Sequence, residues 1–334
     1  MKKVLLLTTG GTIASINGDR GLQPEMDSAM LLDYASELRK YYDIDTKDLL
    51  NLDSSNIQAE EWQTIAQAVY KNLDKYDGIV ITHGTDTMAY TASMLSYMLY
   101  NLNKPVVLTG SQLPIDHLLT DAKNNLYTAF SAVEANIMGV SVAFNHKIIN
   151  GCRAVKVRTL GFEAFESVNA EYLGETTAMG LRVNHDNADR ERSGKVELYD
   201  KVSTKVFLLK LVPGTDPQIL EMLKGLGYRG VVVETFGLGG MHFIRRNLLE
   251  GIKELVSEGI SVVACSQCLY ETSDFSIYEV GKKLLDCGII TARDMTSEAA
   301  VTKLMWALGQ TDDLLEIKNI FNTNFAGEVT ILEV

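Results

Sequence analysis

The stretch GIVITHGTDTM, residues 78–88, changes at His83 from an apolar run to small polar residues. A short continuous apolar run that ends in glycine and polar residues is typical of a strand buried on both faces. Apolar residues then recur at helical spacing over 87–102. The stretch therefore predicts a buried strand that delivers a polar loop, followed directly by a helix.

Strand-like and helix-like segments alternate on both sides of this stretch. In the N-terminal part, strands are predicted at 3–9, 104–110 and 139–144, and helices at 59–76 and 120–136. In the C-terminal part, strands are predicted at 205–214, 230–237 and 259–266, and helices near 217–226, 245–258, 278–287, 297–308 and 311–321. Such alternation indicates parallel βαβ units with right-handed crossovers.

The alternation weakens between residues 151 and 205, where the chain becomes polar and rich in charge. We therefore predict a two-domain α/β protein. A larger N-terminal parallel-sheet domain is expected over 1–187, a linker over 188–205, and a smaller C-terminal α/β domain over 206–334.

The chain of 334 residues carries a formal charge of −12, from 31 basic and 43 acidic residues. There is no basic surplus to offset phosphate charge, which argues against a nucleic acid or an anionic membrane as partner. The apolar run Val4–Leu7 is too short for a secretion signal and is followed by glycines. We expect a cytoplasmic protein without a membrane span.

The four cysteines include one pair with metal-ligand spacing, Cys265 and Cys268. A structural zinc site usually needs a second pair, and Cys152 and Cys287 do not form one. We interpret the cysteines as buried or incidental thiols and expect no metal.

Polar loops that carry glycine follow three predicted strands of the N-terminal domain, at Thr8–Thr12, His83–Asp86 and Thr109–Gln112. A fourth loop, Asn51–Asn56, adds two serines. Ligands of parallel sheets bind beyond the carboxyl ends of the strands. We therefore expect the four loops to converge on one crevice.

Thr85 and Asp86 allow two interpretations. Either side chain can cap the helix that follows, and the helix start alone favours this interpretation. A cap does not explain why Gly84 precedes the pair, or why the first strand also ends in glycines. The neighbouring His83 is expected to be a packed, hydrogen-bonded residue.

The first loop, TGGTIAS, lacks the glycine spacing and the lysine of nucleotide-binding loops. Gly10 and Gly11 instead allow a tight turn and close approach of the backbone to a ligand, with Thr12 exposed beyond them. If a threonine is the nucleophile, a lysine whose pKa is lowered by burial can take its proton.

Two segments, TTGGTIAS and GIVITHGTDTM, resemble the signature segments of the bacterial L-asparaginase (asparaginase/glutaminase) family. Other segments resemble that family in the same order: LDSSN, VVLTGSQLP, GCRAVKVRTLGFEAFES and SEAAVTKLMWALGQ. The resemblance spans nearly the whole chain and is closest to the cytoplasmic type I branch.

The resemblance implies a two-domain α/β fold and hydrolysis of L-asparagine to L-aspartate and ammonia. It also implies a threonine nucleophile, an acyl-enzyme intermediate, weaker activity on glutamine, and no metal or organic cofactor. A homodimer or homotetramer is expected. Two alternatives use the same crevice: a ligand-binding or regulatory protein, and a nucleotide-dependent enzyme.

The motifs carry the family's residue roles to this chain. Thr12 matches the nucleophilic threonine, and Lys156 matches the lysine that partners Thr85. Asp86 is expected to bind the substrate α-ammonium, and Ser54 or Ser55 its α-carboxylate. Backbone N–H groups near Gly11–Thr12 and Gly84–Thr85 are expected to stabilise the oxyanion.

The segment Ile16–Met26 departs from the family pattern. Many members carry a tyrosine in this loop, whereas here Leu22–Gln23 occupies the region and the nearest tyrosine is Tyr34. Gly18 and Gly21 predict a mobile lid that only excludes water.

Overall fold

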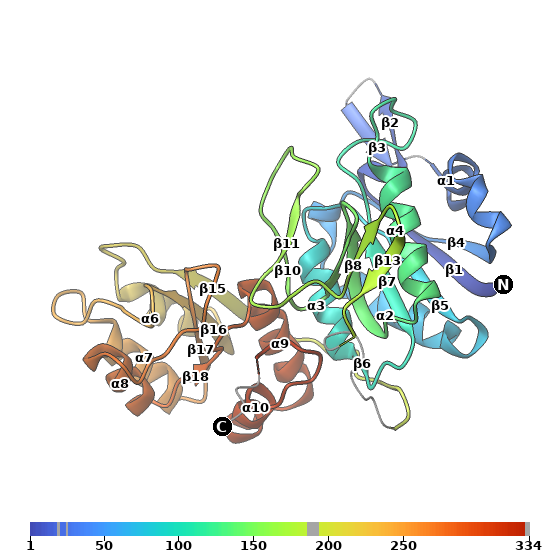
Figure 1. Ribbon diagram of the computed structural model, residues 1–334. Coiled ribbons are helices and arrows are strands. Elements are labelled where there is room, and N and C mark those ends of the chain that lie inside the picture. Colours follow the sequence, from blue (N-terminus) through green and yellow to red (C-terminus); the bar gives the residue numbers. More distant parts are fainter. Residues whose placement is uncertain (19–20, 25, 186–193, 331–334) are drawn as a thin grey trace. The chain divides into compact units, whose positions relative to one another are not determined.

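In the computed structural model the chain forms two compact units, Met1–Asp200 and Lys201–Val334. The structure describes residues 1–18, 21–24, 26–185 and 194–330, and for 17–18 and 21–24 the backbone only. Unit 1 is built on a largely parallel sheet with helices, and unit 2 is a smaller α/β unit (Figure 1). The predicted fold class is confirmed.

Unit 1 contains an eight-stranded sheet with the order β13-β12-β9-β8-β7-β5-β1-β4. Five strands are parallel: β1 (Lys2–Gly10), β4 (Tyr42–Leu52), β5 (Gly78–Thr82), β7 (Pro105–Thr109) and β8 (Gly139–Phe144). Three antiparallel strands extend the sheet: β9 (Lys147–Asn150), β12 (Gly174–Thr177) and β13 (Gly180–Val183).

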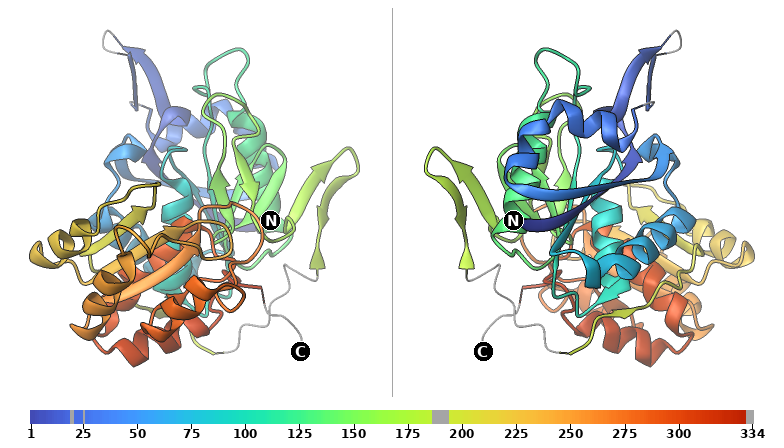
Figure 2. Two further views of the ribbon diagram at one scale, coloured as in Figure 1. Left: turned by 90° about the vertical axis from the view of Figure 1, so that its left-hand side faces the viewer. Right: turned by 90° about the vertical axis from the view of Figure 1, so that its right-hand side faces the viewer.

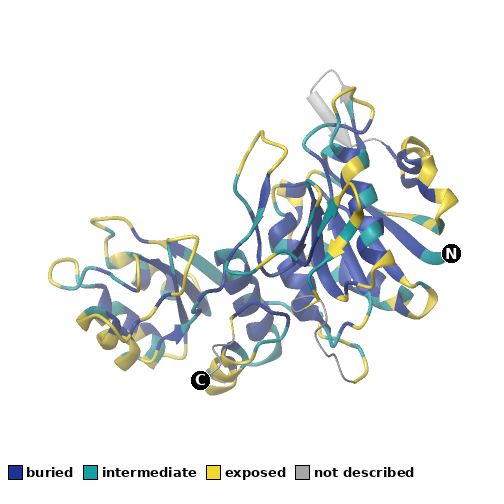
Figure 3. Cartoon of the chain, in the orientation of Figure 1, coloured by how far each residue is buried: buried dark blue, intermediate teal, exposed yellow. Residues whose placement is uncertain are grey.

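The central strands of this sheet are buried along their whole length, as Figure 3 shows in dark blue. Helix α4 (Ala122–Glu134) packs on β5, β7 and β8, and α3 (Met88–Met98) packs on β8 and on α2 (Ala59–Asn72). Val80 and Val107 join one core cluster with Phe130 of α4. Strands buried on both faces appear as continuous apolar runs, which is why the sequence predicted them.

The order of the strands places a topological switch point between β1 and β5. Strand β1 pairs in parallel with β4 on one side and with β5 on the other. The chain therefore leaves β1 for one edge of the sheet and returns across it to β5. At such a point the loops that follow the two strands open beside each other, which creates a binding crevice.

Strand β4 was not predicted, because its exposure alternates along the edge of the sheet. The predicted helix over 87–102 ends at Met98, since Leu99–Tyr100 forms strand β6. Its partner β14 (Glu197–Leu198) lies within the predicted linker 188–205, so this part of the segment is paired with unit 1. The predicted helix over 59–76 ends at Asn72 and continues as a 3-10 turn.

Three hairpins of unit 1 were also not predicted, since they contain short strands without a long apolar run. They are β2–β3 (Ser15–Gly18 and Gly21–Pro24), β10–β11 (Ala154–Lys156 and Phe165–Ser167) and β12–β13. Figure 2 shows β2–β3 in blue and β12–β13 in yellow-green projecting from the sheet. The predicted lid forms β2–β3, but residues 19–20 and 25 lie outside the described residues, and its mobility stays a prediction.

Unit 2 contains a four-stranded parallel sheet with the order β15-β16-β17-β18. Its strands are β15 (Val206–Lys210), β16 (Gly230–Thr235), β17 (Ser261–Ser266) and β18 (Ile290–Thr291). Its helices are α6 (Gln218–Gly225), α7 (Leu248–Ser257), α8 (Glu279–Asp286), α9 (Ser297–Gln310) and α10 (Leu314–Asn322). The sequence predicted all of these except the two-residue β18. None of the helices in the described ranges is long and apolar enough to cross a membrane.

A buried ion pair links α9 to the segment after α10. Lys303 Nζ lies 2.5 Å from Glu328 Oε1, and both side chains are fully buried. The Glu328 carboxylate also accepts from the N–H groups of Phe325 and Ala326. Burial raises the pKa of Glu328, but the charge of Lys303 and these donors lower it more and leave it below its ordinary value.

Candidate active site

The loops that follow β1 and β5 touch through two glycines. Gly11 has φ 81° and ψ 177°, and a Cβ placed on it would lie 2.4 Å from the backbone nitrogen of Gly84. A Cβ on Gly84 would lie 2.6 Å from Ser54 Oγ, in the loop after β4. Only glycine allows such contacts at both positions. Three of the four loops that the sequence predicted to converge therefore pack closely against one another.

Thr12 begins a 3-10 turn in the first loop and is partly exposed. Within the described part of the chain, neither its hydroxyl nor its backbone N–H has a hydrogen-bond partner. The N–H of Gly11, in contrast, donates to Leu52 O at 3.0 Å. The N–H of Gly11 is therefore not available to an oxyanion, whereas the N–H of Thr12, also among the expected donors, has no acceptor in the described residues.

Thr85, Asp86 and Lys156 come together although Lys156 lies 71 residues beyond Thr85. Lys156, the last residue of β10, places Nζ 2.7 Å from Thr85 Oγ1 and 2.6 Å from Asp86 Oδ1. Thr85 is buried, whereas the Asp86 side chain is 63% exposed and can contact a ligand directly. One lysine thus connects a buried hydroxyl with an accessible carboxylate.

The helix-cap interpretation of Thr85 and Asp86 is wrong. Helix α3 begins at Met88, its N-cap residue is Thr87, and no side chain caps it. The Thr87 hydroxyl donates instead to Ser54 O at 2.7 Å. Asp86 and Thr85 lie one and two residues before the N-cap position.

The two serines of the loop after β4 differ in environment. Ser54 is buried, and its Oγ accepts from the N–H of Asp86 at 3.2 Å. Its hydroxyl proton remains available to another acceptor. Ser55 is exposed and donates its hydroxyl and its N–H to Asp53 Oδ1, which holds the pKa of Asp53 below its usual range. Ser54 therefore lies against the Gly84–Asp86 turn, whereas the side chain of Ser55 is directed to Asp53.

His83 is a packed residue, as predicted. Its ring is fully buried, with Nδ1 2.7 Å from Gly84 O and Nε2 2.9 Å from Thr91 Oγ1. A carbonyl only accepts, so Nδ1 carries the proton and Nε2 accepts from Thr91. Trp62 Nε1 in turn donates to Thr91 Oγ1 at 3.0 Å. Burial lowers the pKa of His83 to about 4, so the neutral ring fixes the Gly84 carbonyl ahead of Thr85.

Gln112 follows β7 and faces the same site. Its Oε1 lies 3.5 Å from Thr85 Oγ1, and its Nε2 donates to Thr159 O at 3.1 Å and Gly161 O at 3.0 Å. Sequence reasoning placed Gln112 among the polar loop residues but gave it no role. Its partners lie at the tip of the β10–β11 hairpin, and no sequence pattern indicated that contact.

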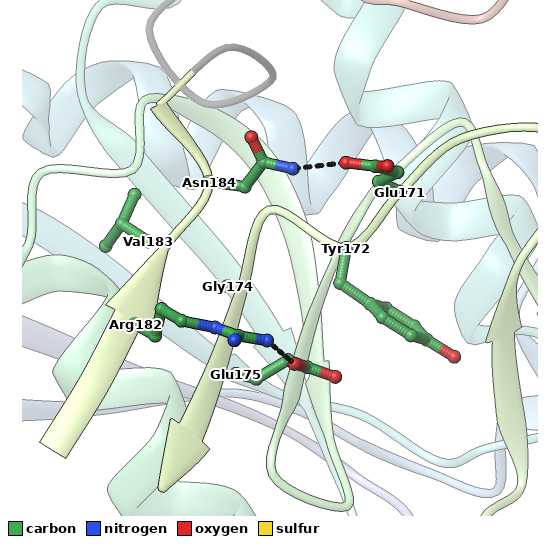
Figure 4. Close-up of a pocket in the computed structure, with 7 residues that line it drawn as sticks. All are labelled: Glu171, Tyr172, Gly174, Glu175, Arg182, Val183 and Asn184. Atoms are coloured by element: carbon green, nitrogen blue, oxygen red, sulfur yellow. Dashed lines mark hydrogen bonds and ion pairs between the residues drawn. The ribbon is translucent and has the colours of Figure 1, made fainter. Parts of the chain in front are cut away.

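A cavity of about 520 Å³ beside β12–β13 is a weaker candidate (Figure 4). Four of its polar side chains pair with one another: Arg182 lies 2.6 Å from Glu175, and Asn184 donates to Glu171 at 2.6 Å. No group of three or more potential metal ligands occurs in the described residues. The cavity therefore offers a ligand few free polar groups.

Both units match known family models. Residues 3–189 match the model for Asparaginase, N-terminal, and residues 205–321 match the Glutaminase/Asparaginase C-terminal domain. The chain is an enzyme of the asparaginase/glutaminase family.

Relatives with this fold span the whole chain. An L-asparaginase of Thermococcus kodakarensis is 44% identical over 331 residues, covering 98% of this chain and 99% of the relative. The solved thermostable L-asparaginase from Thermococcus kodakarensis has a TM-score of 0.93, 43% identity, and covers 99% of this chain and 100% of its own. L-asparaginase I from Vibrio cholerae has a TM-score of 0.90 and 32% identity, with 99% of each chain covered.

A second group of relatives has a different name. A glutamyl-tRNA(Gln) amidotransferase subunit from Pyrococcus furiosus is 37% identical over 338 residues, covering 98% of this chain and 76% of that protein. The similar relatives therefore include archaeal proteins named L-asparaginase and archaeal proteins named as an amidotransferase subunit. The expectation of a specifically bacterial family is not supported, whereas membership of the asparaginase/glutaminase family is.

Proposed function

We propose that the protein hydrolyses L-asparagine to L-aspartate and ammonia through an acyl-enzyme on a threonine. The observation that carries this proposal is the 2.7 Å contact between Lys156 Nζ and the Thr85 hydroxyl. It pairs a hydroxyl with a potential base beside a loop that carries a second, free hydroxyl, Thr12. The 44% identical relative named L-asparaginase supports the choice of substrate.

Thr12 is the proposed nucleophile, because its hydroxyl is unengaged within the described residues and lies beyond the Gly11 turn. Its oxygen attacks the carboxamide carbon while its proton passes through Thr85 to the amine of Lys156. The C–N bond then breaks, and the proton returns to the leaving nitrogen, which departs as ammonia. Splitting the hydrolysis into acylation and deacylation avoids direct attack of water on an unreactive amide.

The negative charge that develops on the amide oxygen needs donors in place before the reaction. The backbone N–H groups of Thr12 and Thr85 have no acceptor in the described residues, and their loops touch through Gly11 and Gly84. We propose these two N–H groups as the oxyanion donors. Each well-placed donor contributes roughly 3–4 kcal/mol.

The substrate backbone is held by the polar rim of the same site. The exposed Asp86 carboxylate binds the α-ammonium, and the hydroxyl of Ser54 or Ser55 binds the α-carboxylate. In the second half-reaction a water molecule, deprotonated through the Lys156–Thr85 contact, attacks the ester. The C–O bond to Thr12 breaks, which releases L-aspartate and restores the hydroxyl.

Thr85 is the alternative nucleophile, because a nucleophile is expected to lie next to its base and Lys156 contacts Thr85 directly. Rapid acid quenching during turnover, followed by peptide mass mapping, would locate the acyl group. An added aspartyl mass on the peptide that contains Thr12 supports the first assignment. The same mass on the peptide that contains Thr85 would reverse the roles of the two threonines.

The function is tested by ammonia release from purified protein. Wild type and Thr64→Ala, which removes an exposed hydroxyl on α2, should release ammonia from L-asparagine at equal rates. Thr12→Ala and Thr85→Ala, purified in parallel, should release no ammonia. Because a contaminating host enzyme would be present in all four preparations, this result excludes it. No ammonia from wild type, or equal rates in all four proteins, would refute the proposal.

L-Glutamine is proposed as the poorer substrate. One additional methylene in a fitted pocket changes transition-state binding by about 1–3 kcal/mol, so the preference should be clear but incomplete. Equal kcat/KM for the two amides would contradict this preference.

A role in an amidotransferase is the second candidate, favoured by the 37% identity to the amidotransferase protein of Pyrococcus furiosus. The net charge of −12 argues against tRNA binding by this chain. Measuring tRNA binding by filter retention, together with ammonia release, separates the candidates. Tight tRNA binding without free asparaginase activity would favour the second.

We also propose a cytoplasmic homodimer or homotetramer that needs no metal or organic cofactor. The similarity to a probable cytoplasmic L-asparaginase from Campylobacter jejuni, with a TM-score of 0.81 and 30% identity, supports the location. Light scattering at micromolar concentration should give an oligomer. Activity that survives exhaustive chelation and dialysis should show that no metal is required.

A further inference from the structure

The carboxamide of Gln112 joins two parts of the active site that are distant in the sequence. Its nitrogen donates to two carbonyls, Thr159 O at 3.1 Å and Gly161 O at 3.0 Å. Its oxygen faces Thr85 Oγ1 at 3.5 Å. The two carbonyls can only accept, so they fix which end of the amide is nitrogen and turn the oxygen toward Thr85.

The backbone of Gln112 is held as firmly as its side chain. Its N–H donates to Asp121, whose carboxylate also accepts from the N–H of Leu113 and from Asn125 Nδ2. Asn125 Nδ2 in addition donates to Gly110 O at 2.9 Å. The loop after β7 is thus fixed to the start of α4, and Gln112 extends from a rigid base.

The carbonyls that Gln112 binds belong to the loop that follows Lys156. This loop joins β10 to β11 and is closed by a hydrogen bond from the N–H of Val157 to Ala164 O at 2.8 Å. Thr159 and Gly161 are exposed, and no other side chain holds their carbonyls in the described residues. Among the described residues, Gln112 therefore ties the carbonyls of this loop to the loop after β7.

We propose that Gln112 is a positioning residue for the reaction: it orients the Thr85 hydroxyl and fixes the loop that carries Lys156. In the free protein Lys156 donates to the Thr85 oxygen, and the Thr85 hydroxyl hydrogen points to Gln112 Oε1. During acylation this hydroxyl turns to Lys156 as Thr85 takes the proton of Thr12. At 3.5 Å the contact between Thr85 Oγ1 and Gln112 Oε1 is long in the free protein. Catalytic hydrogen bonds often shorten when the substrate binds.

This inference rests on the proposed function and makes a specific kinetic prediction. Gln112 has no direct role in holding the substrate backbone, so its loss should lower kcat and leave KM nearly unchanged. A displacement of about 1 Å in a reacting group can cost about 100-fold in rate. We expect kcat to fall about 10- to 100-fold in Gln112→Met, which keeps the length of the side chain and removes both polar ends.

The matched control is Gln67→Met, a similar loss of a glutamine hydrogen bond on α2. It should leave kcat and KM at wild-type values. Gln112→Glu is the second variant, because an ionised carboxylate can accept from Thr85 but cannot donate to the two carbonyls. It should also lose kcat if the tether matters. Wild-type kcat in both Gln112 variants would overturn the proposal.

A double-mutant cycle shows whether Gln112 acts through Thr85. If it does, Gln112→Met combined with Thr85→Ala should be no slower than Thr85→Ala alone. If the fold-losses in kcat of the two substitutions multiply in the double variant, Gln112 acts independently of Thr85. That outcome would overturn the orienting role. If Gln112→Met only destabilised the fold, it would lower the melting temperature, and its effect on kcat would multiply with that of Thr85→Ala.

Hydrogen exchange tests the tether without any reliance on activity. Amides of residues 157–164 should exchange at least several-fold faster in ligand-free Gln112→Met than in wild type or Gln67→Met. Unchanged exchange would overturn the tether. If the wild type releases no ammonia from asparagine, the proposed function fails, whereas the exchange result still decides whether Gln112 fixes the loop.

Discussion

Gly11 and Gly84 approach so closely that a Cβ on Gly11 would lie 2.4 Å from the backbone nitrogen of Gly84. The contact joins the loop after β1 to the loop after β5, at the switch point of the sheet. It brings the turn of Thr12 beside the turn of Thr85. Parallel pairing of β1 with β5 sets the strand ends level, and the two glycines allow the remaining approach.

Gly11→Ala should therefore remove activity and destabilise the protein. Two penalties combine: φ of 81° costs an L-residue about 1–2 kcal/mol, and the added methyl group forces the loops apart. Gly180→Ala is the control, since Gly180 has φ 103° with nothing within 4 Å of its Cβ position. The control should lose a few degrees of melting temperature and keep full ammonia release. Equal behaviour of the two variants would contradict the steric argument.

Thr12→Ala and Thr85→Ala should each reduce kcat by at least about 1,000-fold, because each removes one member of a unit that works together. The double variant should be little slower than either single variant. Since Thr85 caps no helix, Thr85→Ala should not incur the loss of about 1 kcal/mol expected for a lost cap. Melting temperature and kcat measured on the same sample decide this. A destabilised, fully active Thr85→Ala protein would contradict both claims.

Asp86→Asn should act mainly on KM, because the substrate ammonium loses its charged partner. Hydrogen bonds to charged groups contribute about 1.5–3 kcal/mol, which corresponds to an increase in KM of about 10- to 150-fold. Asp53→Asn, in the neighbouring loop, should change KM far less. An Asp86→Asn protein with unchanged KM for asparagine would exclude Asp86 as the ammonium partner.

The sequence predicted the strand ends better than the contacts between them. The buried strands β1, β5 and β7 are apolar runs, so the loops that carry Thr12, Thr85 and Gln112 could be placed at one edge of a sheet. The edge strand β4 alternates in exposure and left no such run. Lys156 was assigned by family resemblance alone, because no local pattern connects residues 71 positions apart. The Gln112 tether depends on a hairpin tip that no periodicity indicates.

The buried Lys303–Glu328 pair predicts an asymmetric response to substitution. Lys303→Met leaves the Glu328 carboxylate buried without its cation, and should lower the free energy of unfolding by about 3–5 kcal/mol. Lys303→Met combined with Glu328→Leu removes both charges and should recover a large part of that loss. Urea denaturation of the three proteins checks this. A double variant less stable than Lys303→Met would contradict the prediction.

His83 should make stability depend on pH. Burial lowers its pKa from about 6.5 in the unfolded chain to about 4 in the folded protein, so the unfolded chain binds more protons between these values. The free energy of unfolding should therefore fall as pH decreases from 6.5 to 4, by up to about 3 kcal/mol, and should be unaffected by this group above pH 6.5. Buried carboxylates such as Glu328 contribute in the same direction, so the difference between wild type and His83→Asn is the useful quantity.

His83→Asn retains a donor for Gly84 O and removes the titration. Denaturation at pH 7.5 and 4.5 should show a smaller loss in His83→Asn than in wild type, and equal losses would mean that His83 does not titrate as a buried neutral ring.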